Sequence, residues 1–166
     1  MMKSIPGYTN VMPANDTIVF SSKDIKLVVI ATDLKGAANL TANAPPSYAT
    51  DNVFVIYGLV NPTLAVPSGA TLQVTFVNLD NDIYHNFAMA SLGPPYPYMA
   101  MQGMMYWQQQ RPWMAMEPFL PPANNGLGLV HEYSYTVTLG DQGSLWYLCT
   151  YPGHAQAGMY GKVLVG

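Results

Sequence analysis

The sequence predicts an all-β fold, built as a sandwich of two sheets. Apolar runs of strand length recur along the 166 residues, turn-forming residues separate them, and few windows repeat with the period of a helix. The clearest run is 71–78, in which Leu72, Val74 and Phe76 alternate with polar residues. Many short strands divided by turns favour a two-sheet sandwich over a helical fold.

The individual strands are predicted from short segments rich in β-branched and apolar residues. They are 16–20, 25–31, 53–60, 71–78, 131–139, 144–149 and 162–165. Residues 33–47 are predicted to form a loop, because they contain Gly36 and two adjacent prolines, Pro45 and Pro46. Residues 62–69 are expected to carry the chain into a turn that ends at Gly69.

Residues 92–124 differ in kind from the rest of the chain. They hold six of the eleven methionines, seven prolines and only two charged residues, Arg111 and Glu117. We expect an ordered insertion packed on the sandwich before the last three strands, with a short helix between Met99 and Gln110. Packing of the methionines against aromatic rings is the preferred interpretation, and the alternatives are Cu(I) binding and a soft docking surface.

Composition limits the classes of function. A chain of 166 residues is most simply one domain, 1–166, large enough to bury a core without disulfides. Only 9% of the residues are charged, and the net charge of -3 comes without a basic run, which argues against nucleic acid as a partner. No apolar stretch approaches the ~20 residues of a membrane-spanning helix. Membrane association is therefore expected only through an anchor outside this sequence.

A stretch of eleven residues, 149–159, carries the chemistry. It contains the single cysteine, Cys149, followed at matched spacings by His154 and Met159 in a Cys-x4-His-x4-Met pattern. A thiolate, an imidazole and a thioether suit copper when a second imidazole arrives from elsewhere, and the leading candidate is His85, shortly beyond the 71–78 strand. The four residues would form a trigonal site of two histidines and one cysteine, with a weak axial methionine.

Other uses of these residues fit the pattern less well. A structural zinc site would need four strong donors, and a thioether is a poor zinc ligand. A dinuclear copper centre would need two bridging cysteines, whereas the chain has one. A cysteine nucleophile, with His154 or His85 as its base, leaves the methionine spacing unexplained. His131 alternates with Tyr133 and Tyr135 on the inward face of its strand and is expected to be structural rather than a ligand.

These motifs resemble those of the cupredoxins, the small blue copper proteins. The resemblance lies in the 149–159 loop, in the upstream His85-Asn86-Phe87 and in residues 62–78. The Cys-x4-His-x4-Met spacing is similar to that of rusticyanin, and together with the run 145–154 it most resembles that of the archaeal sulfocyanins. Rusticyanin differs at the position of Asn86, where it carries serine.

The resemblance implies a Greek-key β-sandwich with one type 1 copper ion that cycles between Cu(I) and Cu(II) in electron transfer, and it does not imply an enzyme. The equatorial ligands would be His85, Cys149 and His154, and the axial ligand would be Met159. Asn86 would tie the two ligand-bearing loops together. The imidazole edge of His154 would reach an uncharged surface, where redox partners of a respiratory chain, such as a terminal oxidase or a cytochrome complex, would dock.

Two rival functions and the cellular location complete the expectations. The rivals are a copper-storage or chaperone protein that uses the Met-rich segment and a domain of a copper enzyme, although three histidines are few for an enzyme of that kind. The expected location is extracytoplasmic, at a cell surface or in a periplasm-like space, with a membrane anchor. Glycosylation sequons at Asn15 and Asn39 are consistent with an extracytoplasmic location. The low count of carboxylates favours an acidic medium, because few groups lose their charge there.

Overall fold

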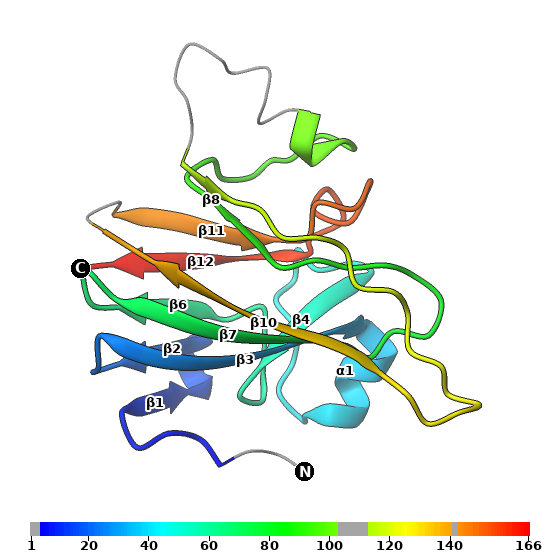
Figure 1. Cartoon of the computed structure of the whole chain (residues 1–166), viewed down its shortest axis with the longest axis horizontal. Helices are drawn as coiled ribbons and strands as arrows, with labels where there is room; N and C mark the ends of the chain where they lie inside the picture. The colour runs from blue at the N-terminus through cyan, green and yellow to red at the C-terminus, as the bar shows by residue number, and fades with distance from the viewer. Residues whose placement is uncertain (1–3, 103–112, 141–142) are drawn as a thin grey trace.

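Two β-sheets form the framework of the computed structural model, which describes residues 4–102, 113–140 and 143–166 (Figure 1). In the described residues the first sheet has seven strands, in the order β1 (Thr9–Met12), β2 (Thr17–Phe20), β6 (Thr63–Val66), β12 (Tyr160–Val165), β11 (Ser144–Leu148), β8 (Ala88–Ala90) and β9 (Met114–Ala115). The second has five, in the order β10 (His131–Thr138), β7 (Thr71–Asn78), β3 (Asp24–Asp33), β4 (Asn52–Ile56) and β5 (Leu59–Val60). The predicted all-β sandwich is confirmed.

The core lies between the two sheets and follows the predicted alternation. In β7 the apolar residues Leu72, Val74 and Phe76 are buried, while Gln73 is exposed. Strand β3 pairs in parallel with β7 and buries its own alternating apolar residues in the same cluster. Apolar side chains removed from water in this way supply the main driving force for folding. Rings from both sheets meet edge to face at the centre, with Phe54 against Phe87 and Tyr147.

Strand β11 presents its two faces as the alternation predicts. Leu145 and Tyr147 point into the core, and Cys149, which follows the strand, belongs to the same buried cluster. Leu148 lies in a separate small cluster with Ala155 and with residues of the insertion. The strand therefore carries the cysteine on the core side and receives the insertion on the other.

The prediction of a loop over 33–47 is wrong in its first half. Helix α1 (Leu34–Leu40) begins there, with the Asp33 side chain accepting a hydrogen bond of 2.6 Å from the Gly36 backbone N–H. This N-cap and the packing of Ala37 beside Val53 hold a helix that the residues Gly36 and Asn39 alone do not favour. A short 3-10 helix, Pro13–Asn15, precedes β2. No helix in the described ranges is long and apolar enough to span a membrane.

The described parts of the insertion, residues 92–102 and 113–124, pack on the sandwich at its β8 edge, and for these residues the predicted packing is confirmed (Figure 1). Tyr96 and Ala100 are buried against Leu148 and Ala155. Strand β9, inside the insertion, extends the sheet by pairing with β8. Of the predicted helix, residues 100–102 are helical, and most of the remainder lies outside the described residues.

Candidate metal centre

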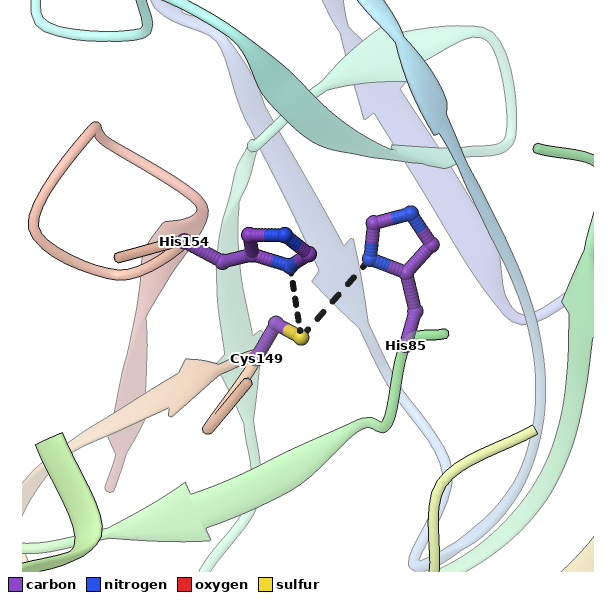
Figure 2. A group of neighbouring side chains, drawn as sticks. All are labelled: His85, Cys149 and His154. Carbon is purple, nitrogen blue, oxygen red and sulfur yellow. Dashed lines mark hydrogen bonds between the residues drawn. The ribbon is translucent and has the colours of Figure 1, made fainter. Parts of the chain in front are cut away.

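Three potential metal ligands converge at one end of the sandwich. The Cys149 sulfur lies 3.4 Å from Nδ1 of His154 and 3.7 Å from Nδ1 of His85 (Figure 2). All three ligand atoms lie within 4.8 Å of one another, and all three side chains are buried. In the part of the chain that the structure describes, this is the one group of at least three histidine, cysteine or carboxylate side chains close enough together to hold a metal ion. Residues predicted from sequence to share a site, 64 positions apart, are thus brought together.

The loop from Cys149 to Met159 is closed by its own backbone. Cys149 N–H donates to the carbonyl of Met159 at 3.2 Å, and Met159 N–H donates to the carbonyl of His154 at 3.0 Å. Gly153 and Gly158 have φ of 84° and 101°, a region that side chains disfavour. These turns return the chain so that Met159 is fully buried in the same cluster as Cys149. The Cys-x4-His-x4-Met spacing therefore corresponds to one compact loop.

His85 is held by a buried carboxylate that the sequence analysis missed. Its Nε2 lies 3.0 Å from Oδ2 of Asp80, and the side chains of His85 and Asp80 are 0% and 4% exposed. Since Nε2 faces Asp80, Nδ1 is left to face the cysteine sulfur. A carboxylate that accepts from the second nitrogen of an imidazole fixes the tautomer and raises the donor strength of the first. An aspartate five residues before a predicted ligand was the only signal in the sequence.

Asn86 joins the His85 loop to the cysteine loop. Its Nδ2 donates to Oγ1 of Thr150 at 2.8 Å, and its Oδ1 accepts from the Thr150 N–H at 2.8 Å. Nδ2 also donates to the carbonyl of Glu117 at 3.0 Å. One buried amide thus fixes the residue after Cys149 against the residue after His85 and attaches the insertion to both.

Burial sets the protonation of the ligands. Burial raises the pKa of the Cys149 thiol to about 12, although backbone hydrogen bonds with Asn86 and Tyr151 act in the opposite direction. Burial and then the neighbouring His85 lower the pKa of His154 to about 4. Burial alone would raise the pKa of Asp80, but hydrogen bonds with His85 and Asp82 outweigh it and the pKa is lowered. At neutral pH His154 is therefore uncharged and ready to bind, and the thiol releases its proton when a metal binds.

The two sulfur–nitrogen separations fit a metal ion. A first-row metal about 2.3 Å from a sulfur and about 2.0 Å from a nitrogen, with about 120° between the bonds, separates the two donors by about 3.7 Å. The observed separations of 3.4 and 3.7 Å agree with this value. One thiolate and two imidazoles, with a buried methionine at the end of the same loop, are the donor set of a type 1 copper site rather than of a structural zinc site.

His154 is the ligand nearest to the surface. It is 5% exposed, whereas His85, Cys149 and Met159 are 0% exposed. Tyr151 covers it, with ring centroids 4.7 Å apart, and Phe119 lies 5.6 Å beyond Tyr151 in an edge contact. The predicted surface edge of His154 is thus small, and aromatic rings take up the rest of that surface.

The insertion also contacts the ligand loop directly. Gly153 N–H donates to the carbonyl of Tyr98 at 2.7 Å, and a Cβ on Gly153 would lie 3.0 Å from the Tyr98 ring. Ala100 packs beside Ala155. His131, by contrast, is exposed at the start of β10 and is not part of the ligand group.

Comparisons with known proteins agree with this geometry. Residues 59–166 match the family described as copper binding proteins, plastocyanin/azurin family. Rusticyanin from Acidithiobacillus ferrooxidans is 32% identical over 152 residues, which are 92% of this chain and 83% of that protein. Rusticyanin from Acidithiobacillus ferridurans is also 32% identical over 152 residues, with 68% of its length covered.

Solved structures show the same fold. The 1.27 Å structure of rusticyanin from Thiobacillus ferrooxidans superposes with a TM-score of 0.66 at 27% identity, covering 96% of this chain and 86% of that one. Reduced rusticyanin at 1.9 Å gives a TM-score of 0.57 at 27% identity, covering 91% of this chain and 85% of that one.

Proposed function

Because the chain belongs to the plastocyanin/azurin family of copper-binding proteins, we propose that His85, Cys149 and His154 hold its single copper ion, with Met159 as a weak axial ligand. The observation that carries this assignment is the convergence of three buried donor atoms within 4.8 Å. Their chemistry, one thiolate and two imidazoles, is that of a type 1 site. The protein is accordingly a blue copper electron-transfer protein.

The bound copper supplies a one-electron couple between Cu(I) and Cu(II). The chain contributes a site that is held in place from all sides. Asn86 fixes the position of Thr150 beside the cysteine, Asp80 fixes His85, and backbone hydrogen bonds close the loop around His154. A site held in this way changes little between oxidation states, so little reorganisation opposes electron transfer.

Electrons are proposed to leave through His154. Tyr151 and Phe119 extend from its ring to the surface, where Phe119 is 37% exposed. Tyr98 of the insertion, which is 59% exposed, packs against the loop that carries His154, at Gly153. An apolar, aromatic surface beside a cofactor suits brief docking of redox proteins over a small interface. A terminal oxidase or a cytochrome complex of a respiratory chain is the proposed partner class, which stopped-flow oxidation of the reduced protein by each candidate tests.

We also propose that the protein works outside the cytoplasm in an acidic medium. The support is the low charge content, 9% of residues, together with the two sequons. Protease treatment of intact cells followed by immunoblotting tests the location. Thermal unfolding measured from neutral to strongly acid pH tests whether the protein is suited to an acidic medium. Unfolding near the usual carboxylate pKa would contradict that proposal.

The decisive experiment is addition of Cu(II) to the copper-free protein. We expect an intense absorption near ~600 nm from the thiolate–copper bond. Cys149→Ser should abolish this band, and the matched control His131→Ala should retain it, because His131 lies outside the ligand group. A colourless product with Cu(I) bound would instead support the storage or chaperone function.

A further inference from the structure

The contact between Asp80 and His85 is enclosed by the insertion. Ala123 N–H donates to the carbonyl of Asp80 at 2.7 Å. His85 and Leu120 exchange two backbone hydrogen bonds, of 3.2 and 2.7 Å, in an isolated bridge. The returning arm of the insertion, residues 117–124, therefore covers the loop that carries both members of the pair.

The sandwich holds the same loop from the other side. Asn78, the last residue of β7, accepts from the Asp80 N–H through Oδ1 at 2.9 Å. Its Nδ2 donates to the carbonyls of Leu120 and Pro121, each at 3.1 Å. Asn78 thus links Asp80 to the covering arm. Asp80 is fixed at its N–H, its carbonyl and its carboxylate, so its orientation toward His85 is set by the fold.

We propose that Asp80 is a positioning residue that aims His85 at the copper and whose buried negative charge favours Cu(II) over Cu(I). The proposal rests on the assignment of His85 as a copper ligand. A hydrogen bond to Nε2 directs Nδ1 toward the cysteine sulfur, as observed. A carboxylate in this place also strengthens the imidazole as a donor, which stabilises the more highly charged ion. In a site shielded from water, this charge acts with little screening.

Two substitutions separate orientation from charge. Asp80→Asn keeps an oxygen that accepts from Nε2 but removes the charge, and Asp80→Ala removes both. Asp24→Asn is the matched charge control, since Asp24 is exposed and lies at the opposite end of the β3–β7 pair from Asn78. For each variant, spectroelectrochemical titration gives the reduction equilibrium, chelator competition gives the copper affinity, and thermal melting reports folding.

For Asp80→Asn we expect the blue band to persist and the equilibrium constant for reduction to rise about tenfold, which is about 59 mV for a one-electron couple. For Asp80→Ala we expect the copper affinity to fall about 10- to 100-fold. Asp24→Asn should change neither by more than twofold. A reduction equilibrium in Asp80→Asn equal to that of Asp24→Asn, or an unchanged affinity in Asp80→Ala, would overturn the proposal while leaving a blue wild-type protein intact. A wild-type protein without the blue band would refute the ligand assignment itself.

Discussion

Gly158, the residue before Met159, is a point where the ligand loop lies directly against another segment of the chain. Its φ is 101°, and a Cβ built on it would collide with the Tyr48 carbonyl oxygen and lie 2.7 Å from the Ala49 Cα. Both neighbours are backbone, so neither can rotate away as a side chain would. Gly158→Ala must therefore push the loop off the 48–50 segment. At present the two are joined by a hydrogen bond of 2.9 Å from the Thr50 N–H to the carbonyl of Ala157 in the loop.

The cost follows from two separate effects. A backbone conformation that side chains disfavour costs about 1–3 kcal/mol. An extra methyl group in a packed region costs about 1–3 kcal/mol more. The sum of the two central values is a loss of about 4 kcal/mol, a large part of the roughly 5–15 kcal/mol that stabilises a typical domain.

Urea unfolding of the copper-free protein measures this loss, with Gly128→Ala as the matched control. Gly128 also has a positive φ, of 64°, but nothing lies within 4 Å of a Cβ placed there. The control should lose only about 1–2 kcal/mol, from the backbone term. Equal losses in the two variants would refute the argument from close packing. A shift of the blue band in Gly158→Ala alone would show that the displaced loop also moves Met159.

Three further predictions concern the site. Asn86→Ala should lower the free energy of unfolding by about 3 kcal/mol in urea titrations, because it removes three hydrogen bonds and leaves the Thr150 N–H without its acceptor. The control Asn10→Ala, at an exposed position, should cost less than about 0.5 kcal/mol. Similar losses in the two variants would contradict the role of Asn86 in joining the two loops. In the copper-free protein, NMR should show His154 titrating near pH 4. Because this pKa is lowered relative to the unfolded chain, stability should be constant above about pH 6.5 and fall as the pH drops toward 4; a midpoint near 6.5 would contradict burial of the ring. His131→Ala should leave the copper affinity unchanged within twofold by chelator competition, and a larger loss would make it a ligand.

The sequence was sufficient to predict features formed by residues that lie close together in the chain. The alternation in β7 and the closed loop from Cys149 to Met159 are local, and the structure contains both. Pairing of His85 with this loop was predicted from donor chemistry and family resemblance, since it depends on contacts between distant strands. The assignment of 1–166 to one domain and the special likeness to the sulfocyanins stay predictions.

The features that were missed depend on tertiary contacts. Helix α1 is only seven residues long, too short to be stable on its own, and forms because Asp33 caps it and Ala37 packs beside Val53. Strand β6 is only four residues long and gains its stability from parallel pairing on both sides, with β2 and β12. Asp80 gave only a weak signal, its place five residues before a predicted ligand, because its role arises only when the insertion folds back over it.

The position of β12 in the first sheet determines when the site can form. This strand follows the ligand loop in the chain, yet it lies in the interior of the sheet, between β6 and β11. During synthesis the sheet therefore stays open until β12 has emerged, and three of the four proposed ligands emerge only just ahead of it. The proposed ligands are therefore held together only once β12 has paired between β6 and β11, late in the folding of the chain.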